Sequence, residues 1–134
     1  MRRLQGFTLV EVMAAVLIFM IGLVGILFVS IESMSMTKRA EYAYTAYNLA
    51  KNRLETLRAM SFDDLASAEE TEVTVDESGV SDEAGNFIRS TAIETGYSGD
   101  SDLVSAAVTV SYLFKGQQSG GPMEMSTVIY NAEG

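Results

Sequence analysis

The chain contains neither cysteine nor histidine among its 134 residues. Without cysteine it can form no disulfide and no thiolate metal site, so the fold must rely on its core. Without histidine it lacks the commonest general base and metal ligand. Asp, Glu, Lys and Ser remain available, but the sequence gathers them into no recognisable catalytic arrangement. We therefore expect that the protein is not an enzyme and needs no cofactor.

Positively charged residues are few. The chain carries 9 Lys and Arg against 18 Asp and Glu, which gives a net charge of −9 and an isoelectric point near 4.3. A nucleic-acid partner would require Lys and Arg clustered on one face, so we expect no such partner. Between residues 63 and 102 the only cation among many carboxylates is Arg89. We interpret most of these carboxylates as the solvated surface of a soluble domain.

Charge is absent from a long apolar run near the N-terminus. Residues 12–29 form 18 consecutive positions without a charged or strongly polar side chain, after a short basic leader at residues 1–6. As a helix they would cover roughly 27 Å, close to the apolar thickness of a bilayer. The run is too long for a secretory signal, and no A-x-A-like site follows it. We predict a single-pass membrane helix over residues 7–31, with a cytoplasmic N-terminus favoured by Arg2 and Arg3.

Glu11 is the one charged residue inside this membrane segment. A carboxylate costs about 2.5–3.5 kcal/mol at the middle of a bilayer, and less near an interface. Glu11 could lie at headgroup depth and simply reach water. Alternatively, it could meet a positive group of a partner within a protein assembly. The physics of the sequence leaves both interpretations open.

The helical pattern continues beyond the membrane segment. From Thr37 to Met60 apolar residues recur at spacings of three and four, which defines one helix face. These residues are Ala40, Ala43, Tyr47, Ala50, Leu54 and Leu57. The charged residues of the stretch, including Arg53, mostly fall on other faces. Because no proline occurs between residues 7 and 60, we predict one long helix whose second half packs on a sheet.

Strand patterns follow the helix, at residues 72–75, 87–94, 103–114 and 123–130. The clearest is the third, which alternates apolar residues with mostly smaller or polar ones. Its apolar set is Val104, Ala106, Val108, Val110, Tyr112 and Phe114. Residues 115–122 are rich in glycine and hold the single proline, so we interpret them as a hairpin turn. Antiparallel strands against a helix make an α+β domain, here a head over residues 32–134.

The segment Gly6-Phe7-Thr8-Leu9-Val10-Glu11, between the basic leader and the apolar run, resembles the motif of type IV prepilins and type II secretion pseudopilins. The resemblance implies that a prepilin peptidase cuts between Gly6 and Phe7, on the cytoplasmic side of the inner membrane, and N-methylates Phe7. It also implies that Glu11 pairs with the Phe7 amine of a neighbouring subunit during assembly. The expected partners are this peptidase, other pilins or pseudopilins, and the inner-membrane assembly platform. The mature chain would then move from the membrane into a periplasmic or extracellular filament.

The rest of the chain resembles this family less closely. A strand carrying Arg89, followed by two strands joined by a glycine-rich turn, resembles the small modules of V-type minor pilins and I-type minor pseudopilins. Many major pilins have a proline in the anchor and a disulfide-closed C-terminal loop, and this chain has neither. These departures favour a minor pilin that takes part in pilus assembly or function. A minor pseudopilin of a type II secretion system is the alternative, and an uncleaved, membrane-anchored binding domain is the second alternative.

An acidic turn at residues 96–102 is a candidate for calcium binding. Asp100 and Asp102 could supply oxygen ligands, and some pseudopilins bind calcium near their C-terminus. The spacing of a calcium-binding loop with a distant Glu is absent. Because Asp, Ser and Gly are the usual turn formers, we favour a plain turn.

Overall fold

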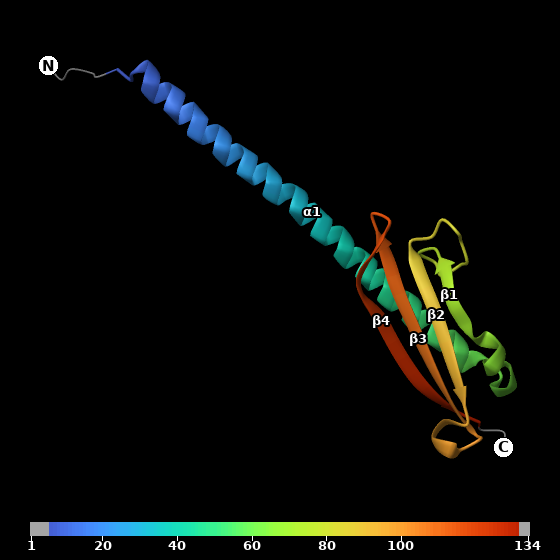
Figure 1. Ribbon diagram of the computed structural model, residues 1–134. Helices are drawn as coiled ribbons and strands as arrows, with labels where there is room; N and C mark the ends of the chain where they lie inside the picture. Colours follow the sequence, from blue (N-terminus) through green and yellow to red (C-terminus); the bar gives the residue numbers. More distant parts are fainter. Residues whose placement is uncertain (1–5, 132–134) are drawn as a thin grey trace. The chain divides into compact units, whose positions relative to one another are not determined.

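The computed structural model describes residues 6–131, and the chain divides into two units, Met1–Lys38 and Arg39–Gly134. We call them the N-terminal unit and the C-terminal unit. The long helix α1 (Leu9–Ala59) begins in the first and ends in the second (Figure 1). The predicted helix is thus confirmed to within two residues at each end, as expected for a stretch without proline.

The C-terminal unit holds a four-stranded antiparallel sheet in the order β1-β2-β3-β4. Its strands are β1 (Glu70–Val75), β2 (Phe87–Thr95), β3 (Leu103–Phe114) and β4 (Gln117–Tyr130). A short 3-10 helix, η1 (Phe62–Ala68), connects α1 to β1. Figure 1 shows the last part of α1 against one face of the sheet. The predicted α+β class is therefore confirmed.

The core lies between α1 and the face that β3 turns toward the helix. Every second residue of β3 from Val104 to Val110 is buried, as the alternation of the sequence predicted. The connection η1 adds apolar side chains at the end of the helix. The buried apolar residues are Ala46, Leu49, Ala50, Leu54, Leu57, Leu65, Ala68, Val75, Phe87, Val104, Ala106, Val108, Val110, Tyr112 and Phe114.

Tyr42 closes this core near the start of the C-terminal unit. Its ring makes edge contacts with Phe87, Tyr112 and Phe114, with centroid separations of 5.7, 6.0 and 6.2 Å. Such edge-to-face pairs contribute about 0.5–1.5 kcal/mol each beyond the area they bury. Tyr47, by contrast, is exposed.

The buried stripe of α1 differs from the predicted one. Ala40 and Tyr47, which the pattern assigned to the buried face, are exposed, whereas Ala46 and Leu49 are buried. The observed stripe is rotated by roughly 60° from the predicted one, at 100° per residue. Arg53 lies near its centre with a largely buried side chain. Ala50, Leu54 and Leu57 are buried as predicted, so the apolar pattern found one side of this face and missed the other, because a charged residue occupies its middle.

The connection between β3 and β4 is much shorter than predicted. Phe114 pairs with Gln117, so the turn consists of Lys115 and Gly116 alone. Both turn residues have positive φ, 55° and 76°. This is the geometry of a type I′ hairpin turn, whose twist matches that of the flanking strands. The prediction of a turn through residues 115–122 is therefore wrong.

The glycine-rich part of the predicted turn is instead a bulge inside β4. The register shifts between Val110 and Tyr112, so that Gly120, Gly121 and Pro122 together lie opposite one residue of β3. Gly120 has a φ of 79°, which glycine adopts without the penalty of a Cβ. Proline is tolerated in strands at bulges and edges. The residues that suggested a turn therefore distort the strand rather than end it.

Gly120→Ala should destabilise the C-terminal unit by about 1–2 kcal/mol. The new Cβ would meet the strain of a positive φ and would lie 2.8 Å from the Tyr112 hydroxyl oxygen. Gly121→Ala is the matched control, because a Cβ there meets nothing within 4 Å. Thermal melting followed by circular dichroism compares the two. Equal melting temperatures would contradict the bulge geometry.

Candidate processing and assembly site

The start of α1 lies two residues after the predicted cut. Gly6, Phe7 and Thr8 are outside the helix, which begins at the next residue. The backbone N–H of Glu11 donates to the Thr8 hydroxyl oxygen at 3.3 Å, and the N–H of Val12 donates to the Thr8 carbonyl oxygen at 3.2 Å. The first N–H groups of a helix have no partner within the helix, and a capping threonine supplies one. The Thr-x-x-Glu spacing is that of a capping box, so the motif also sets where the helix begins.

The peptide bond between Gly6 and Phe7 lies in this non-helical stretch. Among the described residues, nothing lies within 4 Å of the position that a Cβ at Gly6 would occupy. Phe7 is exposed as well. Packing within the described residues therefore does not require a glycine here. Cleavage at this bond stays a prediction.

Phe7 and Glu11 lie on the same side of the N-terminal end of the chain. One shallow groove is lined by Phe7, Glu11, Val12, Ala15, Val16 and Phe19. The Glu11 carboxylate is thus a polar group on an otherwise apolar, exposed surface. Its place in the first turn of α1 is favoured by the helix dipole by about 0.3–1 kcal/mol. A carboxylate costs roughly 2.5–3.5 kcal/mol in mid-bilayer, which is more than the helix dipole provides. At that depth the remaining stabilisation would have to come from water or from a cationic partner.

The apolar surface of α1 is fully exposed in the N-terminal unit. An 18-residue window of the helix has a mean hydropathy of 3.0, and none of this window is buried within the chain. The hydroxyls of Ser30 and Thr37 donate to the carbonyl oxygens of Ile26 and Ser33, so these polar groups find partners within the helix. By length and composition, α1 is able to cross a membrane once.

The acidic turn at residues 96–102 forms hydrogen bonds of its own. It contains a short 3-10 helix, η2 (Tyr97–Gly99), and the Asp100 carboxylate accepts the backbone N–H of Asp102 at 3.0 Å. Within residues 6–131, no three His, Cys, Asp or Glu side chains gather where they could hold a metal ion. The expectation of a plain turn without calcium at Asp100 and Asp102 stays a prediction.

A buried charged cluster, formed by Arg53, Glu70, Arg89 and Thr91, was not predicted. Glu70 accepts hydrogen bonds from Arg89, Nε to Oε2 at 2.9 Å and Nη2 to Oε1 at 3.1 Å. Arg53 pairs with the same carboxylate, Nη2 to Oε1 at 3.1 Å, and Thr91 donates to Oε2 at 3.2 Å. The side chains of Arg53, Glu70 and Arg89 are only 17%, 21% and 11% exposed. Glu70 is therefore an exception to the solvated carboxylates predicted for residues 63–102.

The charged cluster ties three parts of the C-terminal unit together. Arg53 of α1 also donates to the carbonyl oxygen of Ala68 at 2.9 Å, and Arg89 of β2 donates to that of Gly79 at 3.0 Å. Through the shared carboxylate of Glu70, these contacts hold α1, the end of η1 and the loop after β1 to β2. The one signal in the sequence was Arg89, an isolated cation among carboxylates, whose partner could not be chosen from many candidates. The cluster has the character of a structural site.

Comparison with known proteins identifies the N-terminal segment. Residues 1–27 match the family model described as the prokaryotic N-terminal methylation motif. No curated protein and no solved structure matches the chain. The motif implies processing by a prepilin peptidase and association with other pilins, and together with α1 it fits single-pass anchoring in the inner membrane. The chain thus carries the signature of prepilins and pseudopilins, on a pilin-like architecture of one long N-terminal helix and an antiparallel sheet.

Proposed function

We propose that this protein is a minor pilin, a low-abundance structural subunit of a type IV pilus. The observation that carries the proposal is the methylation motif at residues 1–27, continued by an exposed apolar helix. Prepilin peptidase cuts between Gly6 and Phe7 on the cytoplasmic side and methylates the new amine. Residues 7–31 then anchor the head, residues 32–134, on the outer side of the inner membrane until the assembly platform extracts the subunit. The role is structural rather than catalytic.

The Phe7 amine and the Glu11 carboxylate supply register during assembly. In a bundle of apolar helices each of these charges is costly alone, and each is relieved by the other. A single polar pair among otherwise uniform apolar surfaces selects one alignment, as a buried polar residue does in coiled coils. Glu11 of one subunit therefore meets the Phe7 amine of its neighbour.

Two absences support a minor rather than a major subunit. The chain has no cysteine with which to close a C-terminal loop, and no proline between residues 7 and 60. A minor pseudopilin of a type II secretion system shares the same motif and remains the second candidate. Copurification with pili supports the first candidate, and copurification with a secretion apparatus supports the second. An uncleaved, membrane-anchored binding domain is the third, and it would retain residues 1–6.

Glu11→Val should leave membrane insertion intact, because it removes a polar cost from the anchor. Its incorporation into filaments should fall by about ten-fold or more, since a loss of ~1.4 kcal/mol is ten-fold in an equilibrium constant. Immunoblots of sheared filaments and of membranes measure the two quantities. Glu32→Val is the matched control, because it removes another exposed carboxylate of α1. Normal incorporation of Glu11→Val would mean that Glu11 serves only as an interface residue.

A further inference from the structure

We propose that the outer edge of β4, from Glu124 to Tyr130, pairs with an extended segment of a different subunit, which adds a fifth strand to the sheet. The inference rests on the proposed function, because it names the surface through which this subunit docks in the assembly. β4 is the last strand in the order β1-β2-β3-β4. Among the described residues, no strand pairs with its outer edge.

One hydrogen bond identifies the backbone groups that face outward. The N–H of Asn131 donates to the carbonyl oxygen of Asp102 at 2.9 Å, in the register that pairs Leu103 with Tyr130. Residues of an antiparallel strand alternate between those bonded to the neighbouring strand and those that face away from it. The odd-numbered residues of the segment therefore bond to β3. The N–H and C=O groups that face outward are those of Glu124, Ser126, Val128 and Tyr130.

The opposite edge of the sheet, on β1, is protected against pairing. β1 has only 6 residues, and its register shifts between Glu70 and Val73. Within the shift, Glu72 has a positive φ of 49°, and its N–H donates to the Ser90 hydroxyl oxygen at 3.0 Å. Short length, bulges and charge are the devices by which proteins prevent pairing at an edge.

The bulge and the proline of β4 lie at residues 120–122, and the edge from Glu124 to Tyr130 lacks such devices. From residue 123 to residue 130 its register with β3 is regular, and Glu124 is the only charged residue. It also exposes two large apolar side chains, Val128 at 49% and Tyr130 at 65%. A long, regular, weakly charged edge with unpaired backbone groups accepts an extended chain, whose main-chain hydrogen bonds provide the affinity.

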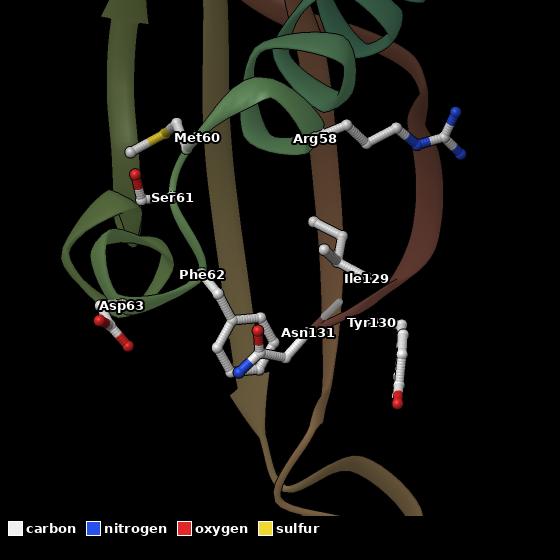
Figure 2. A pocket seen from close by; sticks show the side chains of 8 residues that line it. All are labelled: Arg58, Met60, Ser61, Phe62, Asp63, Ile129, Tyr130 and Asn131. Atoms are coloured by element: carbon white, nitrogen blue, oxygen red, sulfur yellow. The ribbon is translucent and has the colours of Figure 1, made fainter. Parts of the chain in front are cut away.

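A cavity beside the end of β4 can receive a side chain of the added strand. It has a volume of about 420 Å³, and its lining includes Met60, Phe62, Ile129 and the exposed Arg58 (Figure 2). Arg58 donates from Nε and Nη2 to the Thr127 hydroxyl oxygen at 3.2 and 2.7 Å, which holds its guanidinium beside β4. Every second residue of an added strand would face the helix side of the sheet, next to Thr127 and Ile129. The lining also includes Ser61, Asp63 and Asn131, so the cavity fits a segment with a polar side chain at that position.

A second copy of this chain does not fit the edge. α1 runs along the strands, because Tyr42 contacts Phe114 at one end of β3 while Arg58 bonds to Thr127 near the other. Antiparallel pairing of two β4 edges would need a two-fold axis perpendicular to the sheet. The parts of α1 between Tyr42 and Arg58 would then run in opposite directions in the two copies, whereas the helices of the proposed filament all run in one direction. Pairing of β4 with β1 of another copy would meet the irregular edge at Glu72.

The test changes Val128 in the full-length chain, expressed in cells that assemble the filament. Val128→Pro deletes one outward N–H and no hydrogen bond to β3, whereas Val128→Ala deletes the exposed side chain and keeps the N–H. Both should insert, be processed and melt close to the wild type. We expect incorporation into isolated filaments to fall by about ten-fold for Val128→Pro, because a buried partner group is left unpaired, and to change little for Val128→Ala.

Amide hydrogen exchange on the wild-type chain gives a second measurement that needs no substitution. In detergent micelles the amides of Ser126 and Val128 should exchange quickly, whereas those of Met125 and Thr127 should exchange slowly because they bond to β3. In the isolated filament all four should exchange slowly.

The outcomes separate this inference from the proposed function. The fifth strand is supported if Val128→Pro loses incorporation while Val128→Ala keeps it, and if the amides of Ser126 and Val128 are protected in the filament. Normal incorporation of Val128→Pro, or even-numbered amides that stay fast in the filament, would overturn the inference and leave the proposed function standing. A wild-type chain that never enters the filament would overturn both the proposed function and the inference of a fifth strand. If Val128→Pro fails to fold, the exchange pattern of the wild-type chain alone decides whether the edge of β4 is paired in the filament.

Discussion

Leu54→Asp is expected to unfold the C-terminal unit or to lower its melting temperature by more than about 15 °C. Leu54 is 5% exposed and belongs to the core between α1 and the sheet. Truncating a buried leucine costs about 2–5 kcal/mol, and the new carboxylate would in addition be buried without a partner. Domains of this size have a total stability of only about 5–15 kcal/mol. The substitution therefore removes a large share of what holds α1 to the sheet.

Tyr47→Asp is the matched control for Leu54→Asp. Tyr47 lies about two turns earlier on the same helix and is 45% exposed, so a carboxylate there stays in water. We expect its effect to remain within about 1 kcal/mol. Circular dichroism with thermal melting compares the variants, both in the full-length chain in detergent and in a fragment that begins near Ser35. That fragment should be soluble, monomeric and folded, because the apolar surface of the anchor is removed. A Leu54→Asp variant that melts like its parent would mean that this face of α1 is exposed.

Glu70→Gln should destabilise the C-terminal unit by about 3–5 kcal/mol, because removing one partner leaves buried charges uncompensated. One carboxylate serves both Arg53 and Arg89, and the two guanidinium groups lie 3.1 and 2.9 Å from it. Glutamine keeps the shape of the side chain but provides neither the charge nor two acceptor oxygens. Both arginines would therefore remain largely buried without a counter-charge.

Glu69→Gln, at the exposed neighbouring position, is the control and should change stability by less than about 0.5 kcal/mol. High salt adds a second discriminating condition. It should screen the exposed pair of Lys51 and Glu55, but it should leave most of the effect of Glu70→Gln. Chemical denaturation of both variants at low and high salt measures these differences. Equal unfolding free energies for Glu69→Gln and Glu70→Gln would contradict a buried charged cluster.

The elements whose signals are local could be predicted from the sequence. The bounds of β3 follow from the alternation of its residues from Val104 to Val110, because one side of the strand faces the core and the other is only partly buried. The long helix follows from the absence of proline together with a continuous apolar run. The processing motif at Gly6, Phe7 and Glu11 is a short contiguous pattern, so the sequence alone is enough to recognise it.

The features that depend on distant partners could not be predicted in this way. The buried stripe of α1 was misplaced because Arg53 occupies its centre, and a charge is buried there only because Glu70 of β1 lies opposite. The bulge at Gly120 looked like a turn because glycine and proline serve both purposes. The open edge of β4 is a property of strand order, which no residue of β4 encodes by itself.

The mass of the mature N-terminus most directly tests the central claim that this chain is processed as a prepilin or pseudopilin. The full-length chain is produced together with a prepilin peptidase, and the purified product is analysed by intact mass and by sequencing of its N-terminal peptide. Gly6→Leu is the control, and it should stay uncut because a side chain at this position blocks approach to the backbone. We expect the wild-type product to begin at Phe7 with a methylated amine and to lack residues 1–6. Full processing of Gly6→Leu would contradict the assigned cut site, and a wild-type product that keeps residues 1–6 would contradict the processing of this chain as a prepilin or pseudopilin.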